Sequence, residues 1–183
     1  MPEPGPPSRR PIDLMLREEL LTRARNDRAA RHAHAGGGTP WSAVEQVDRD
    51  NVAFLTPHLA RVGWLGSDLV GKLGAHACWL LVLHAPAEQQ QMWLPLMRTA
   101  VLDGWADERD LAYLQDRCDV NAGRPQVHGT VTYGDPGRLW PLAQPDEVNE
   151  LRAMLNMRPL SEDELANAWT VDELSQQHHL AHP

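Results

Sequence analysis

The stretch GAHACWLLVLHA, residues 74–85, decides the fold of this chain. Its side chains are apolar nearly all round, and Pro86 follows directly. A helix that is apolar on every side has to be buried on every side. A short apolar run also fits a buried strand, because periodicity alone does not separate the two. We expect a helix, placed at the centre of the protein and ended by Pro86.

Helical spacing of apolar residues continues on the N-terminal side. Residues 12–34 form an amphipathic helix with a heavily charged opposite face, so the apolar face must dock on its own domain or on a second copy, as a homodimer. That face carries Leu14, Leu16, Leu20 and Leu21. The segment Ala-Gly-Gly-Gly-Thr-Pro, residues 35–40, is a hinge. A second helix follows over residues 42–62, with a kink or restart expected at Pro57.

Two more helices are expected on the C-terminal side, over residues 87–103 and 107–120. The inner side of the first carries Met92, Trp93, Leu96, Met97 and Ala100, and that of the second carries Leu111, Leu114 and Cys118. Gly123 and Pro125 end the second of these helices.

After Pro125 the pattern changes from helical to alternating. Residues 126–133 and 138–142 flank a Gly-Asp-Pro-Gly turn, which predicts a β-hairpin. A helix over residues 145–156 follows, and Ser161 with Glu164 matches a capping box that opens a last short helix. The predicted fold class is α+β and mostly helical, a helical bundle around a central apolar helix with one C-terminal β-hairpin.

The chain has 183 residues, of which 42% are hydrophobic, enough for one packed core. We expect a disordered Pro-rich tail over residues 1–11, the amphipathic helix and hinge over 12–40, a single globular domain over 41–175 and a frayed tail over 176–183.

Composition excludes several classes of partner and cofactor. A net charge of −8 argues against a nucleic-acid partner, which needs a basic face. No segment reaches the roughly 20 apolar residues of a membrane helix, and no secretory signal opens the chain, so we expect a cytoplasmic protein with no membrane partner. Neither of the two glycine-rich nucleotide motifs is present and no Cys-x-x-Cys occurs, so we expect no organic cofactor and no thiolate zinc site.

The segment DRCDVNAGRPQVHGT, residues 116–130, is polar where a helix should give way to a strand. Buried polar groups need partners or a function. The segment therefore indicates either a well-bonded turn or a small active site or binding site. Its candidate residues are Asp116, Arg117, Asn121, Gln126, His128 and Thr130.

His84 is the second part of this candidate site, because it ends the central helix. It either caps the helix, where a cation is favourable, or acts as a general acid/base. With His128 it would divide the proton transfers, and Asp116 would orient one of the two rings. Arg117 would bind a carboxylate or phosphate of a small-molecule or peptide ligand, alongside Asn121, Gln126 and Thr130. A metal held by His128, Asp116 and another histidine is the weaker alternative, and we assign no metal.

Residues 47–160 resemble a family of bacterial domains of unknown function whose members read D-x-x-N-x-x-x-L, GWP, WLLVQHAD and AYLTDRVLVN-x-G-x-PQ-x-YGTQ. The matching positions include Asp48, Asn51, Gly63, Trp64, Trp79, His84, Ala85, Tyr113, Asp116, Arg117, Asn121, Gly123, Pro125, Gln126, Gly129 and Thr130. The resemblance implies a site at these positions, and no reaction is established for the family.

Four positions depart from the family pattern: Leu83, Pro86, His128 and Val131. They imply a diverged member that handles a different ligand, or one that has lost its chemistry and kept binding. The sequence thus predicts a small enzyme without an organic cofactor, an isomerase, cyclase, dehydratase or hydrolase, with histidine acid/base chemistry in specialised metabolism. The alternative is a non-catalytic binding or accessory protein with a polar recognition pocket.

Overall fold

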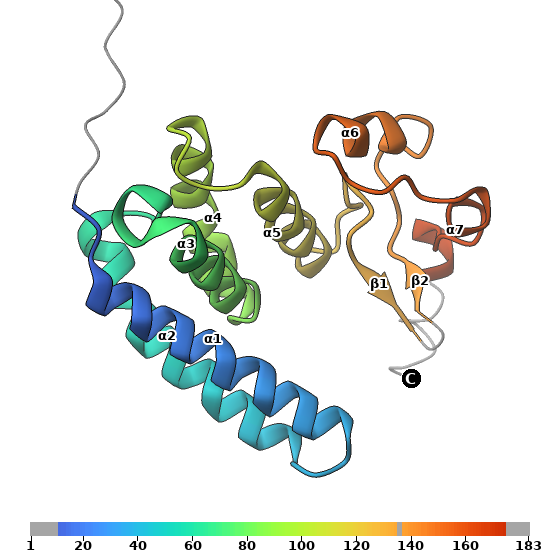
Figure 1. Cartoon of the computed structure of the whole chain (residues 1–183). Helices are drawn as coiled ribbons and strands as arrows, with labels where there is room; N and C mark the ends of the chain where they lie inside the picture. The colour runs from blue at the N-terminus through green and yellow to red at the C-terminus, as the bar shows by residue number, and fades with distance from the viewer. Residues whose placement is uncertain (1–10, 135–136, 175–183) are drawn as a thin grey trace, which may run out of the picture. The chain divides into compact units, whose positions relative to one another are not determined.

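The computed structural model describes residues 11–134 and 137–174 and confirms a mostly helical α+β protein (Figure 1). Its internal contacts gather into two compact units, Met1–Asp107 and Glu108–Pro183. From the sequence we expected a single domain over residues 41–175 with the first helix outside it, and those boundaries stay a prediction.

In the described residues of the first unit, three helices pack around the predicted apolar helix. These helices are α1 (Leu14–Ala35), α2 (Trp41–Val62) and α4 (Ala87–Leu102), and the apolar helix is α3 (Ser67–Leu83). Helix α3 packs against each of the other three, which confirms its central place. Its buried side chains include Val70, Cys78, Trp79, Leu81 and Val82. The helix begins earlier than predicted and is kinked at Gly71, whose φ of 68° is left-handed and suits glycine.

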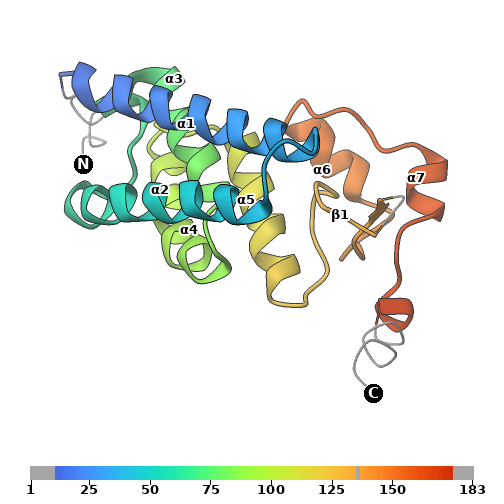
Figure 2. The same cartoon turned by 90° about the horizontal axis from the view of Figure 1, so that it is seen from below.

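Helix α1 docks within its own chain. It runs antiparallel to α2 along the length of both helices and also packs on α3 (Figures 1 and 2). Leu16 and Leu20 are buried as predicted, and the Asp13 carboxylate caps the helix by accepting from the Leu16 N–H at 2.9 Å. Leu14 is 61% exposed and was wrongly assigned to the docked face. A homodimer through this helix stays a prediction.

Two further expectations for this unit are wrong in detail. Helix α2 does not restart at Pro57 but continues to Val62, and the alternative of a kink there stays a prediction. The proline sits in the last turns, where the helix loses one backbone bond and goes on. Met92 of α4 is exposed, whereas Trp93, Leu94 and Met97 form its inner side.

The second unit holds the hairpin and the short helices. Its elements are α5 (Glu108–Asn121), β1 (Thr132–Tyr133), β2 (Arg138–Leu139), α6 (Val148–Met154) and α7 (Glu162–Ala166). Leu139, Val148 and Leu160 form its small apolar core. Gly123, with a φ of 70°, follows the end of α5, and the predicted capping box of Ser161 and Glu164 opens α7.

The hairpin is much shorter than expected. Thr132 pairs with Leu139 and Tyr133 with Arg138, while residues 126–131 form a loop. The strand expected over residues 126–133 is therefore wrong over residues 126–131 and right only for Thr132–Tyr133. The reason is local. Gly129 turns the chain with a φ of 67°, and the buried Asp116 carboxylate accepts hydrogen bonds from backbone N–H groups that would otherwise bond to a neighbouring strand.

The expected tails over residues 1–11 and 176–183 lie almost wholly outside the described residues, as do Asp135 and Pro136 of the expected turn. Within residues 11–134 and 137–174, no helix combines the length and the apolar character needed to span a bilayer.

Candidate functional site

His84 is the C-terminal cap of α3, at the turn that leads into α4. Two bonds from one buried side chain hold this turn: the Gln90 amide donates to the carbonyls of Leu83, at 2.7 Å, and Ala85, at 2.8 Å. Pro86 then fixes the start of α4. The ring of His84 is thus carried on a rigid corner between two packed helices.

The partner of His84 is Asp27 of α1, which the sequence analysis did not single out. Asp27 is fully buried, and its Oδ2 lies 2.8 Å from His84 Nδ1. A buried carboxylate needs compensating partners. The second partner is Arg31, one turn further along α1, whose Nε lies 3.2 Å from Asp27 Oδ1.

The two contacts at Nδ1 demand opposite tautomers of the neutral ring. Arg31 Nε also lies 3.0 Å from His84 Nδ1, but Nδ1 cannot both donate to Asp27 and accept from Arg31. A bare Nδ1 would place its lone pair against a carboxylate oxygen at 2.8 Å, which is repulsive. We therefore assign the hydrogen to Nδ1, donating to Asp27, and the lone pair to Nε2.

Asp48 of α2 is the fourth member of a cluster with His84, Asp27 and Arg31. Its Oδ1 accepts a hydrogen bond from Arg31 Nη2 at 2.6 Å. Burial raises the pKa of Asp48 above its usual 3.8, and the charge and hydrogen bond of Arg31 oppose that rise. One guanidinium therefore bridges two carboxylates that come from different helices. The arrangement locks Asp27 in place beneath the imidazole.

The outer edge of His84 remains available. Its side chain is 25% exposed, and within the described part of the chain no hydrogen bond engages Nε2. An imidazole oriented by a buried carboxylate at one nitrogen and open at the other is the arrangement that general acid/base catalysis uses.

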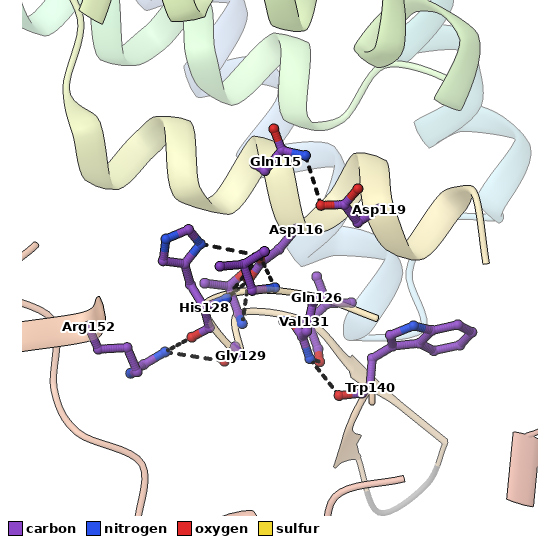
Figure 3. Close-up of polar contacts among 11 residues, drawn as sticks. Gln115, Asp116, Asp119, Gln126, His128, Gly129, Val131, Trp140 and Arg152 are labelled. Atoms are coloured by element: carbon purple, nitrogen blue, oxygen red, sulfur yellow. Dashed lines mark hydrogen bonds and ion pairs between the residues drawn. The ribbon is translucent and has the colours of Figure 1, made fainter. Parts of the chain in front are cut away.

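The second histidine–aspartate pair lies in the other unit and is built differently (Figure 3). Asp116 of α5 is fully buried and accepts from the backbone N–H groups of Val127, His128 and Thr130 at 2.9–3.1 Å, and from the Thr130 hydroxyl at 2.9 Å. Burial alone would raise the pKa of Asp116, but the bonds from His128 and Val127 outweigh it and hold that pKa below 3.8. His128 Nδ1 adds a longer contact of 3.3 Å.

Two other buried side chains fasten the same loop. Gln126 donates to the carbonyls of Val131 and Trp140 at 2.9 and 2.8 Å, and accepts from the Val131 N–H at 2.8 Å. Arg152 of α6 donates to the His128 carbonyl at 2.6 Å (Figure 3). The polar atoms of Asp116, Gln126 and Thr130 thus form hydrogen bonds that hold the 126–131 loop, as expected if this segment is a well-bonded turn.

The remaining candidates are placed as follows. Arg117 and Asn121 are exposed on α5 and take no part in the hydrogen bonds around Asp116. His84 belongs to the first unit, and Asp116, Arg117, Gln126 and His128 belong to the second, each unit with its own histidine–aspartate pair. The convergence of these five residues on one pocket stays a prediction.

Asp27 could have been found in the sequence. The buried stripe of α1 is Leu16, Leu20, Ala24 and Asp27, with steps of one helical turn. A carboxylate that falls in line with an apolar stripe is buried, and a buried carboxylate needs a partner. No recognisable motif surrounds Asp27, and residues 12–34 have the pattern of a simple docking helix, so the residue does not otherwise stand out in the sequence.

In the described ranges, no group of three or more histidine, cysteine, aspartate or glutamate side chains is placed to hold a metal ion. Both cysteines, Cys78 and Cys118, are buried, and neither forms a disulfide bond. Burial raises the pKa of the Cys78 thiol to about 12.

Comparison with known proteins identifies the family. The model of a family described as a family of unknown function (DUF6624) matches residues 14–169. Neither a curated protein nor a solved structure matches the chain. The match takes in both histidine–aspartate pairs, and its description assigns no reaction.

Proposed function

Because the chain belongs to DUF6624, a family of unknown function, we propose its activity from its own geometry: a small enzyme that uses His84 as general acid/base, without an organic cofactor. The observation that carries the proposal is the 2.8 Å contact between His84 Nδ1 and the fully buried Asp27 carboxylate. It leaves Nε2 as the nitrogen that meets the substrate.

The proposed cycle moves one proton. His84 Nε2 takes a proton from the substrate, or in hydrolysis from the attacking water molecule, and the imidazolium that forms is stabilised by the Asp27 carboxylate. The same nitrogen then returns the proton to another atom of the substrate or to a leaving group. Asp27 acts through His84 and is a positioning residue, and Arg31 and Asp48 hold Asp27 in turn.

Isomerisation, cyclisation, dehydration and hydrolysis of a small molecule or a modified peptide all fit this cycle. Specialised metabolism in the cytoplasm is the setting we propose for it. His128 is the second candidate acid/base group, since Asp116 lies 3.3 Å from its ring. The contact is longer and Asp116 is saturated by backbone donors, so we give His84 the principal role.

A non-catalytic binding protein is the second candidate. The observation that favours it is the complete use of Asp116 and Gln126 in holding the 126–131 loop. A loop fastened by three buried polar side chains is a rigid platform, and rigid platforms serve recognition as well as catalysis.

The test is turnover in a metabolite extract, followed by untargeted mass spectrometry. The wild-type protein should consume at least one metabolite, and His84→Gln and Asp27→Asn should abolish or strongly reduce that consumption while circular dichroism stays unchanged. His32→Gln is the matched control, because His32 is exposed on the same helix as Asp27. Full turnover by a folded His84→Gln variant would rule out the proposal. Retention of a metabolite without its conversion would favour the binding protein.

A further inference from the structure

The surroundings of His84 contain a second feature that the acid/base proposal does not use. Where α1 ends and α2 begins, the ring of Trp41 lies beside the guanidinium of Arg31, with 5.8 Å from the guanidinium carbon to the ring centroid. Arg31 is also the residue that contacts Asp27, Asp48 and His84. Trp41 therefore belongs to the same corner of the first unit as the acid/base pair.

Trp41 is 49% exposed, which is a large exposure for an indole. It is nevertheless held in place. The ring of His34 meets it edge-on, with centroids 5.2 Å apart and an angle of 63°, and His34 Nδ1 is fixed by the carbonyl of Thr39 at 2.9 Å. A fixed and half-exposed indole offers an aromatic face on which a planar ring can stack.

Arg31 supplies the hydrogen-bond donor next to that face. Its bonds to the two carboxylates use Nε and Nη2. In the described part of the chain Nη1 makes no hydrogen bond, and it is not sealed from solvent. A ligand that stacks on Trp41 can therefore present an acceptor oxygen to Arg31 Nη1.

The local charge decides which acceptor fits. Two carboxylates, Asp27 and Asp48, surround the one guanidinium, so the fixed charge of the cluster is negative before any proton on His84 is counted. A further carboxylate would meet net repulsion there. An uncharged carbonyl oxygen accepts from Arg31 without that cost.

We propose that the surface formed by Trp41 and Arg31, next to His84, binds an uncharged planar ring that carries a carbonyl group, with the ring on Trp41 and the carbonyl oxygen on Arg31. This deepens the proposed function, on which it rests for the role of His84, because it names the substrate class. The carbonyl would lie on the guanidinium that touches the imidazole, so that an acidic proton near the carbonyl comes within the range of Nε2.

Three small probes of similar size test the proposal on the full-length protein by nuclear magnetic resonance. Benzamide is planar and uncharged, benzoate is planar and anionic, and cyclohexanecarboxamide is uncharged without an aromatic face. The readout is the indole N–H signal of Trp41, assigned by its loss in Trp41→Leu. The indole N–H of Trp169 is the internal control, because Trp169 also lies against an arginine, Arg138, but belongs to the other unit.

Benzamide should shift the Trp41 signal saturably, with a Kd on the order of millimolar, as expected for so small a ligand. Benzoate and cyclohexanecarboxamide should each bind at least about tenfold more weakly. No saturable shift with benzamide, an equal shift at Trp169, or equal binding of benzoate would each overturn the proposal.

The outcome is separable from that of the acid/base proposal. His84→Gln should keep benzamide binding within about threefold, because the stacking face and Arg31 remain. Turnover that depends on His84, without benzamide binding, would contradict only the proposed substrate class. Benzamide binding without any such turnover would contradict only the proposed catalytic role of His84.

Discussion

A single buried carboxylate decides the chemistry available to His84. Asp27 is fully buried, and it reaches Nδ1 of the ring from a helix more than fifty residues away in the sequence. Without it, a histidine at the C-terminus of α3 would be an ordinary helix cap. With it, the ring has one defined tautomer and one open nitrogen.

Asp27→Asn should abolish the preference of His84 for a single tautomer. In the wild-type protein, at a pH where the ring is neutral, long-range ¹H–¹⁵N spectra should show the hydrogen of His84 on Nδ1. An asparagine oxygen is a weaker acceptor than a carboxylate, so the variant should show a mixture that moves towards Nε2–H. His32, which is exposed on α1, should show the same spectrum in both proteins. An unchanged His84 tautomer in the variant would contradict the assignment.

Asp116 has a different task, which is to fold its own unit. Its carboxylate accepts from three backbone N–H groups and one hydroxyl of the 126–131 loop. Asp116→Asn has one acceptor oxygen and places an amide NH₂ against N–H donors. We expect it to lower the free energy of unfolding by about 2–4 kcal/mol at neutral pH.

The same substitution should change the acid response. Because the pKa of Asp116 is held below 3.8, the carboxylate contributes stability above about pH 4 and loses that contribution as the pH falls through its lowered pKa. The difference in the free energy of unfolding between wild type and Asp116→Asn should therefore be largest at neutral pH and should decrease below about pH 4. Urea titrations at several pH values measure this difference, and a difference that stays constant down to pH 3 would assign the carboxylate no such role.

At the scale of the element, helix α1 contributes both packing and chemistry. Leu20 is fully buried against the bundle, whereas Leu14, less than two turns earlier, is 61% exposed. Leu20→Ala should lower the free energy of unfolding by about 2–5 kcal/mol, as expected when a core leucine is truncated. The matched Leu14→Ala should change it by less than about 0.5 kcal/mol. Denaturant unfolding measures both, and similar effects of the two substitutions would contradict the docking of α1 described here.

Elements marked by a local sequence pattern, such as an apolar run or a capping motif, could be predicted from the sequence. Elements whose conformation depends on one buried polar side chain from elsewhere in the chain could not. The apolar run of α3 and the capping box of α7 depend on neighbours in the sequence, so both helices were predicted, although α3 begins earlier, at Ser67. The 126–131 loop looked like a strand because it contains β-branched residues. Its conformation depends instead on Asp116, ten residues earlier, whose carboxylate replaces the partner strand.

The residues of the candidate site also differ in whether a local sequence pattern identifies them. His84 and Asp116 could be chosen from the sequence because each stands at the end of a recognisable pattern. The place of Asp27 in the apolar stripe of α1 marks it in the sequence as a buried carboxylate, but does not name its partner. The pairing of His84 with Asp27 requires α1 to fold back onto α3, and no local pattern specifies that contact.

At the scale of the whole molecule, the two cysteines report on the two units separately. Cys78 is in the core of α3 in the first unit, and Cys118 is buried on α5 in the second. Burial raises the pKa of Cys78 to about 12, so the folded protein should resist thiol alkylation at pH 8. Neither thiol is expected to react before the unit around it opens.

Asp116→Asn should separate the opening of the two units. Its effect falls on the 126–131 loop, which belongs to the second unit, and every bond described for the Asp27–His84 cluster lies within the first. In rising urea, Cys118 of the variant should therefore be alkylated at a lower concentration than Cys78, as measured by peptide mass spectrometry after pulse labelling. In the wild-type protein the two midpoints should lie closer together. Labelling of both thiols at one midpoint in the variant would mean that the chain unfolds as a single cooperative domain, as its sequence suggested, and that the two units share their stability.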